Sequence, residues 1–242
     1  MDEKTHHNTL YPGWHLFSNS VTSASMKKNS TNMKQIILTL TICCLIPNLG
    51  FSQLHQLEQN MKTALILIDI QNDYFDKGTM PLVGSDKASN NAKLILESFR
   101  TDSLPIIHIQ HIATRPTATF FLPNTIGAEI HDNVKPIGQE KVIVKHYPNS
   151  FRDTELLDYL KDKNITDLVI CGMMTHMCVD ATARAAKDFE FNIILIGDAC
   201  ATKDQEINGQ IVKAEEVQKS FLAALNYFYT TVKTTQQYLD KK

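Results

Sequence analysis

The chain contains no stretch in which Lys or Arg gathers. Its 24 Lys and Arg nearly balance its 26 Asp and Glu, so the formal net charge is -2 over 242 residues. A protein that binds nucleic acid normally presents a basic face, because contacts with phosphates supply most of the non-specific affinity. We therefore expect no nucleic-acid partner.

Cysteine is scarce, and its spacing argues against two common roles. Five cysteines are present, of which Cys43 and Cys44 lie in an apolar N-terminal segment. Cys171, Cys178 and Cys200 are left for the rest of the chain, and their spacing matches no Cys/His zinc pattern. An odd number of thiols among alternating strands and helices also argues against a disulfide framework. These three cysteines are expected to be core residues or reactive thiols.

The apolar run near the N-terminus is too short for a stable membrane span, which needs about 20 residues. This run, at 36–46, follows a basic start at 33–35 and precedes a small-residue exit that ends at Gln53. That is the layout of a secretory signal peptide. We expect a leader at 33–52 and an exported protein, periplasmic or secreted.

The segments on either side of this leader are polar. Residues 1–32 have no periodicity and are predicted to be disordered; they would lie upstream of the true start if translation begins at Met33. Met61 is an alternative start, directly before the first predicted strand. That start would give a cytoplasmic domain without a leader. Residues 53–62 are interpreted as a linker, and residues 231–242 as a polar tail.

Between residues 63 and 230, apolar runs typical of buried strands alternate with helical periodicity. The expected strands are 64–69, 105–110, 141–145, 166–172 and 192–198, and the expected helices are 85–99, 154–163, about 178–186 and 214–228. This alternation predicts an α/β domain, with a doubly wound, mainly parallel sheet and helices on both faces. Such sheets bind ligands at the carboxyl ends of their strands. The long irregular segment 111–139 is expected to be functional.

Residues 168–186 have the pattern of a strand, a sharp turn and an alanine-rich helix. Cys178 stands where this helix begins, and unpaired N–H groups together with the helix dipole favour a thiolate there. Cys178 is therefore a candidate nucleophile. A free cysteine is also commonly a small buried hydrophobe, and this stretch alone leaves that alternative open.

Two further reactive residues stand at the ends of predicted strands. Asp69 ends the first strand, and Lys145 ends the third. A carboxylate can accept the proton of a thiol, and an ammonium group can stabilise the resulting charges. Each also has a structural alternative, since Asp69 can cap a loop and Lys145 can be a solvated charge. His146 is the less favoured base, because successive strand residues face opposite sides.

Three ordered segments resemble the signature of the isochorismatase-like cysteine hydrolases. They are LIDIQNDYF at 67–75, Val144-Lys145 ahead of Asn149-Ser150-Phe151, and CGMMTHMCV at 171–179. The resemblance covers residues 63–228, and it implies the doubly wound fold of that family.

The same resemblance implies roles for individual residues. Asp69, Lys145 and Cys178 correspond to the family's catalytic triad. The peptide bond between Met173 and Met174 corresponds to a cis bond. The backbone N–H groups of Met174 and Cys178 would then form an oxyanion hole, which stabilises a developing negative charge.

Differences within that family narrow the expected chemistry. Members that hydrolyse the vinyl ether of isochorismate generally lack the cysteine, so Cys178 favours the branch that hydrolyses amides or ureides. Nicotinamidases of the family carry an Asp-x-His metal motif, whereas the segment here is His108-Ile109-Gln110-His111, without an acid. We therefore expect no catalytic metal and no cofactor. The two histidines are interpreted as polar residues at a strand end.

The sequence thus predicts a cysteine-dependent hydrolase that cleaves a C–N bond in a small amide, carbamoyl or ureido compound through an acyl-thioester intermediate. The alternatives are an isochorismatase-type vinyl-ether hydrolase and a catalytically silent small-molecule binding protein of the same fold. Aromatic residues near the motifs are candidate pocket walls: Tyr74, Phe75, Phe120, Phe121 and Phe151. A small-molecule substrate and a homo-oligomer are expected.

Overall fold

The structure, a computed structural model, describes residues 62–240. The expected extension at 1–32, the leader at 33–52 and all of the linker except Lys62 lie outside the described residues, as do residues 241–242. Within 62–240, no helix combines the length and the apolar character needed to cross a membrane.

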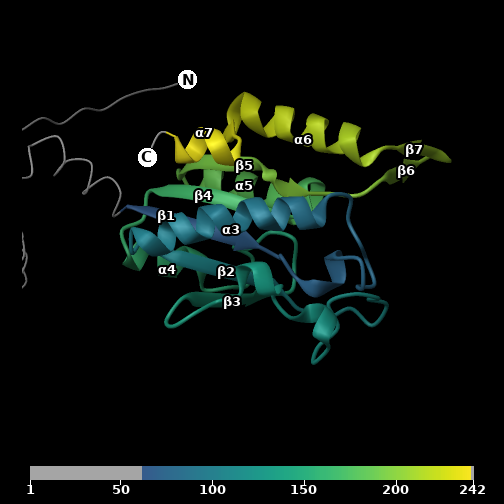
Figure 1. The fold of residues 1–242 in the computed structure, drawn as a ribbon, viewed down its shortest axis with the longest axis horizontal. Coiled ribbons are helices and arrows are strands. Elements are labelled where there is room, and N and C mark those ends of the chain that lie inside the picture. The colour runs from purple at the N-terminus through teal and green to yellow at the C-terminus, as the bar shows by residue number, and fades with distance from the viewer. Residues whose placement is uncertain (1–61, 241–242) are drawn as a thin grey trace, which may run out of the picture. The chain divides into compact units, whose positions relative to one another are not determined.

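A six-stranded parallel sheet forms the centre of the described part of the chain (Figure 1). Its strands are β1 (Thr63–Ile68), β2 (Ile106–His111), β3 (Lys141–Lys145), β4 (Asp167–Met173), β5 (Asn192–Ala201) and β8 (Thr231–Lys233). They lie in the order β3-β2-β1-β4-β5-β8, and all neighbours are parallel. The order reverses between β1 and β4, which opens a crevice at their carboxyl ends.

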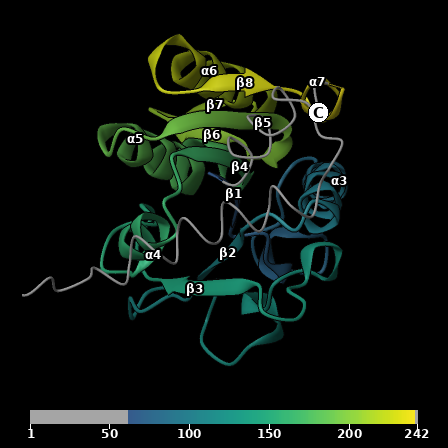
Figure 2. The same ribbon diagram turned by 90° about the vertical axis from the view of Figure 1, so that its left-hand side faces the viewer.

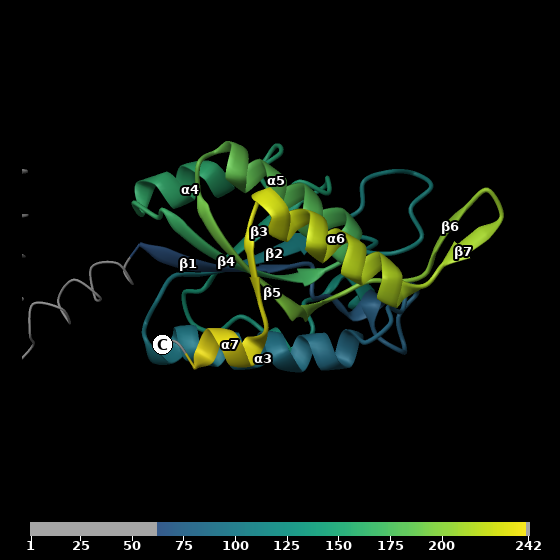
Figure 3. The same cartoon turned by 90° about the horizontal axis from the view of Figure 1, so that it is seen from above.

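Helices cover both faces of this sheet (Figures 2 and 3). One face carries α3 (Ser85–Thr101) and α7 (Thr235–Leu239); the other carries α4 (Leu156–Asp162), α5 (Asp180–Asp188) and α6 (Ala214–Phe228). The predicted doubly wound, mainly parallel α/β fold is confirmed.

The strand β1 separates two apolar cores. Alternate side chains of a strand point to opposite faces, so Leu65 and Leu67 join the core beneath α3, whereas Ile66 and Ile68 join the core beneath α4 and α5. All four are at most 2% exposed. Burial of one such side chain contributes about 1.5–3 kcal/mol, and burial on both faces explains why β1 is a continuous aliphatic run.

Two regions contain strands or helices that were not expected from the sequence. Residues 205–212 form an antiparallel hairpin of β6 (Gln205–Ile207) and β7 (Gln210–Val212), with Asn208 and Gly209 both at positive φ as a two-residue hairpin turn requires. The segment expected as a polar tail holds β8 and α7 over its described residues. Pairing of β8 with β5 and a capping box at Thr234 stabilise these elements.

The irregular segment 111–139 is fixed by two buried polar side chains that follow β1. The Gln71 amide donates to the carbonyls of His111 and Ala128, at 2.9 and 2.7 Å. The Asp73 carboxylate accepts the backbone N–H of Phe121 at 2.6 Å. Only two short 3-10 turns, at 126–128 and 132–134, interrupt the loop. These hydrogen bonds hold the loop over the carboxyl end of the sheet.

Candidate active site

The three residues of the expected triad come from three different strand ends. Asp69 directly follows β1 and Lys145 is the last residue of β3, while Cys178 lies in a π-helical turn (Thr175–Val179) after β4. Asp69 takes a left-handed φ of 50°, which turns the chain sharply and which aspartate tolerates better than most residues. Asp69 and Lys145 are fully buried, and Cys178 is 5% exposed.

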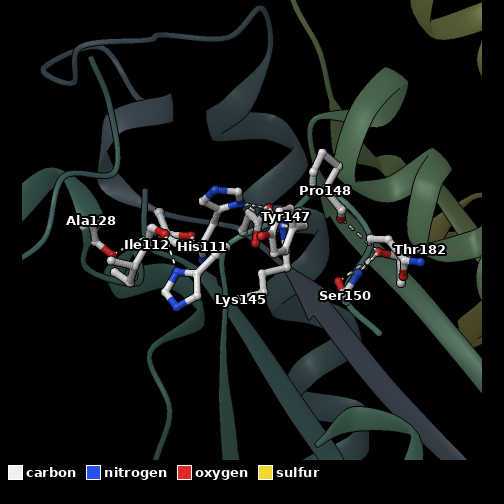
Figure 4. Close-up of polar contacts among 12 residues, drawn as sticks. His111, Ile112, Ala128, Lys145, Tyr147, Pro148, Ser150 and Thr182 are labelled. Atoms are coloured by element: carbon white, nitrogen blue, oxygen red, sulfur yellow. Dashed lines mark hydrogen bonds and ion pairs between the residues drawn. The ribbon is translucent and has the colours of Figure 1, made fainter. Parts of the chain in front are cut away.

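The ammonium group of Lys145 is saturated with acceptors (Figure 4). Its Nζ lies 2.7 Å from Asp69 Oδ2, 3.0 Å from His111 Nδ1 and 3.0 Å from the carbonyl oxygen of Tyr147. β3 is two strands away from β1, so the lysine side chain passes β2 to reach Asp69. His111 stands opposite Lys145 in the β2–β3 register, which places its ring beside the ammonium group.

His111 is neutral in this arrangement. Burial lowers its pKa to about 4, and the Lys145 charge acts in the same direction against the attraction of Asp69. Because an ammonium group only donates, Nδ1 of His111 is the acceptor and the ring proton lies on Nε2. His111 is a site residue that the sequence interpretation treated as a strand-end residue, because nothing local in the sequence reveals the β2–β3 register.

The thiol of Cys178 is protonated at rest. Burial raises its pKa, Asp69 raises it further, and Lys145 opposes this without reversing it. The sequence pattern favoured a thiolate at a helix start, but the loss of solvation has the larger effect here. Burial acts to lower the pKa of Lys145, yet the charge of Asp69 helps to raise it above its ordinary value. The site is therefore a neutral thiol beside a buried carboxylate–ammonium pair.

Asp69, His111 and Cys178 place their ligand atoms within 4.8 Å of one another, as a metal site would. The Lys145 ammonium already contacts two of these residues, at Asp69 Oδ2 and His111 Nδ1. His108 points elsewhere, with Nε2 2.9 Å from Glu140 Oε2. His108 and His111 are three residues apart on one strand, which sends their side chains to opposite faces.

A cavity of about 300 Å³ opens onto the thiol. It is lined by residues from the segments that follow β1, β2, β3 and β4: Tyr74, His111, Thr114, Arg115, Phe120, His146, Tyr147, Pro148, Met174, Met177 and Cys178. This volume suits a small organic molecule. Asp69 and Lys145 are fully buried and are not part of this lining.

Of the five aromatic residues expected in the pocket, Tyr74 and Phe120 line this cavity and three do not. Phe121 is fully buried against Tyr74, with ring centroids 4.6 Å apart. Phe75 stacks on His131 at 3.7 Å, outside the cavity. Phe151 packs against Phe189 and Phe191 in the core beneath α4 and α5. Local sequence does not fix which way a loop aromatic faces, and core packing is its commoner use.

The backbone leading to Cys178 is irregular. The Met173–Met174 peptide bond, where the family resemblance implies a cis bond, is cis. Gly172 before it has a φ of 134°, and a Cβ at this position would collide with the backbone of Ile68 in β1. Thr175 Oγ1 lies within hydrogen-bond distance of Ala201 O and Gln218 Oε1, which ties the turn to β5 and α6. Met174 and Cys178 both lie in the cavity wall.

A comparison with known protein families decides the assignment. The model of the isochorismatase domain matches residues 63–236. The chain belongs to the isochorismatase family. This extent includes β8 and the start of α7, so the family domain continues past residue 230.

Individual relatives agree with this membership. The isochorismatase-family protein YddQ of Bacillus subtilis, which is uncharacterised, is 50% identical over 74% of this chain and 99% of its own length. The crystal structure of a protein from Oleispira antarctica assigned to the isochorismatase hydrolases is 44% identical, with a TM-score of 0.71 over 74% of this chain and 96% of that one. Streptothricin hydrolase of Streptomyces noursei is 34% identical over 58% of this chain and 55% of its own length.

The isochorismatase-family assignment gives the general activity of the chain. Members of the family are hydrolases, and some of those that align with this chain are amidases by name. This chain is accordingly an isochorismatase-family hydrolase.

Proposed function

We propose that this hydrolase cleaves a C–N bond in a small amide, carbamoyl or ureido compound, with Cys178 as the nucleophile. One observation carries the proposal: the thiol lines a cavity of about 300 Å³ while a buried carboxylate and ammonium pair lies next to it. A thiol attacks carbonyl carbon once its proton has a nearby acceptor, and Asp69 is that acceptor.

The groups act in a defined order. As Cys178 Sγ bonds to the carbonyl carbon, its proton moves to Asp69, and the carbonyl oxygen becomes an oxyanion. The N–H groups of Met174 and Cys178 are the donors for that oxyanion. Collapse of the tetrahedral intermediate breaks the C–N bond, and the leaving amine takes the proton from Asp69. Water then gives a proton to Asp69, attacks the thioester and releases the acid and the thiol.

Lys145 positions Asp69 for this proton transfer. Its three fixed contacts hold the ammonium group beside Asp69, so the charge near the thiol is offset before substrate arrives. Preorganised charge of this kind costs no reorganisation during the reaction.

The thiol also distinguishes the proposal from its alternatives. Hydrolysis of a vinyl ether needs no sulfur nucleophile, and a silent binding protein needs no proton acceptor behind a buried thiol. The vinyl-ether reaction leaves Cys178 without a role, and a silent binding protein leaves Asp69, Lys145 and Cys178 all without one.

Ammonia release from a panel of small amides, carbamoyl and ureido compounds tests the proposal. The wild-type protein is expected to release ammonia from at least one class, and Cys178→Ala to release none. Mass spectrometry of the quenched reaction should show the acyl group on Cys178. Turnover by Cys178→Ala, or release of pyruvate from isochorismate without any amide hydrolysis, would refute it.

Two further properties are proposed for the whole chain. The leader at 33–52 would export the protein, with cleavage near Gln53; N-terminal sequencing of protein from native cells tests this, and an intact Met33 or a start at Met61 contradicts it. A homo-oligomer is supported by apolar side chains that stay exposed on α6 and on the β6–β7 hairpin, among them Tyr227, Phe228 and Ile207.

A further inference from the structure

The lining of the cavity at Cys178 includes a positively charged side chain and no negatively charged one. It includes Arg115 and two histidines but no Asp or Glu. The carboxylate of Asp69 lies behind the lining and is neutralised by the Lys145 ammonium at 2.7 Å. Within the described part of the chain, the cavity therefore offers a ligand a fixed positive charge and no accessible negative one.

Arg115 differs from the other arginines of the chain. Arg100 pairs with Glu97 and Glu140, Arg152 with Asp153, and Arg184 with Asp180. The Arg115 guanidinium has no ion-pair or hydrogen-bond partner among residues 62–240; only its backbone carbonyl is used, by the N–H of Ala118. Its charge still acts on the site. It lowers the pKa of His111, although burial and the Lys145 charge lower that pKa more.

The positions of Arg115 and Cys178 define two ends of a ligand. Arg115 follows β2 and Cys178 follows β4, and these strands lie on opposite sides of β1. Both side chains line one cavity of about 300 Å³. A molecule of this size can place a reactive carbonyl at the thiol and a second polar group at the guanidinium.

We propose that Arg115 binds a carboxylate of the substrate, so that the substrate class is a small amide or ureido compound carrying a free carboxylate. This inference rests on the proposed C–N hydrolase function. A guanidinium presents parallel N–H donors that match both oxygens of a carboxylate, and Arg115 is exposed in the cavity lining, so a ligand can reach it. Tyr74, Phe120 and Thr114 line the same cavity.

Alkylation of Cys178 by two matched reagents tests the inference without any turnover. Iodoacetate and iodoacetamide both form an S–C bond to the thiolate and release iodide, but only iodoacetate carries a carboxylate. The rate ratio of iodoacetate to iodoacetamide at Cys178, followed by peptide mass spectrometry, is compared with the same ratio for 2-mercaptoethanol. We expect the ratio to be at least tenfold higher in the protein.

Variants assign that preference to one residue. Arg115→Gln should lower the ratio to that of 2-mercaptoethanol, and Arg115→Lys should retain part of the preference for iodoacetate. Lys93→Gln removes an exposed charge from α3, outside the cavity, and should change nothing. A ratio that Arg115→Gln leaves as in the wild type would overturn the inference.

Protection of Cys178 extends the test to the substrate class. Succinamate and butyramide share an amide, but only succinamate has a carboxylate. Succinamate is expected to slow iodoacetamide labelling at a concentration at least tenfold below that of butyramide, and Arg115→Gln should remove the difference. Equal protection by both compounds overturns the inference, even if amide hydrolysis itself is observed. A protein with no hydrolysis but with the Arg115-dependent preference would instead refute only the proposed reaction.

Discussion

At the scale of single residues, Cys178 is the thiol that should react first. Cys178 and Cys200 are similarly exposed, at 5% and 6%, but their thiol groups have different hydrogen acceptors nearby. Cys200 donates to the carbonyl of Ile196, and burial raises its pKa to about 12. Cys178 faces a cavity and has Asp69 behind it. Iodoacetamide at neutral pH should label Cys178 before Cys200, as mapped by peptide mass spectrometry; labelling in the reverse order contradicts the assignment.

Substitution of the carboxylate tests the same chemistry. Asp69→Asn removes the proton acceptor while nearly keeping its shape, so the hydrolytic rate should fall on the order of 10²- to 10⁴-fold and labelling of Cys178 should slow. Cys171→Ala is the matched control, because Cys171 is fully buried in β4 and does not line the cavity. It should cost about 1 kcal/mol of stability and leave kcat unchanged. An Asp69→Asn variant with wild-type kcat would exclude Asp69 as the base.

His111 should make stability depend on pH. Its pKa is about 4 in the folded protein and near 6.5 unfolded, so between these values the unfolded state binds more protons. Its contribution is fully present above about pH 6.5 and is lost as the pH falls toward 4, by about 3 kcal/mol at most. Urea unfolding at pH 7.5 and pH 5 should show a smaller pH effect for His111→Gln than for the wild type. An unchanged difference would show that other groups carry it.

At the scale of elements, Asp73 should decide how well the loop 111–139 holds its shape. Its carboxylate accepts the N–H of Phe121 and both the N–H and hydroxyl of Thr79. Asp73→Ala leaves a buried N–H without a partner, which costs about 1–3 kcal/mol. We expect faster hydrogen exchange across 113–128 and a raised KM, since Phe120 and Arg115 belong to this loop. Asp76→Ala, an exposed neighbour, is the control and should alter neither; equal effects of the two variants would contradict the assigned role.

The sequence predicted those helices and strands in which the buried residues recur with a regular local spacing. β1 is aliphatic throughout because both of its faces are covered, and α6 shows its period at Val217 and Leu225, which are buried. β8 has three residues and exists through its pairing with β5, a contact between distant parts of the sequence. No local pattern reveals such an element.

The same distinction applies to the site. Asp69, Lys145 and Cys178 stand at strand ends, and parallel strands bring their carboxyl ends to one edge, so their proximity could be predicted. His111 joins them only through the β2–β3 register. Arg115 reaches the cavity only through the shape of a loop that Gln71 and Asp73 fix from another strand end. Contacts of this kind depend on tertiary packing.

At the scale of the whole molecule, the absence of a metal requirement is a prediction about the complete protein. The Lys145 ammonium occupies the position that a divalent ion would take between Asp69 and His111. Dialysis against EDTA or 1,10-phenanthroline should therefore leave kcat/KM unchanged. Stoichiometric zinc or iron by elemental analysis, with activity lost on its removal and restored on its return, would contradict this expectation.

Self-association is the last property to test, because the described part of the chain leaves large apolar side chains in water. Tyr227 is 92% exposed and Phe228 66% exposed, side by side near the end of α6. A soluble protein rarely keeps such neighbours uncovered, and a second copy of the chain would bury them.

Light scattering should give a mass that is a multiple of the monomer mass. The double variant Tyr227→Asp/Phe228→Asp should reduce it to the monomer mass while the circular dichroism spectrum is kept. Leu94→Asp, at an exposed position on α3, is the control and should not change the mass. A wild-type protein of monomer mass at micromolar concentration would leave this α6 surface without the proposed partner and would refute the proposed oligomer.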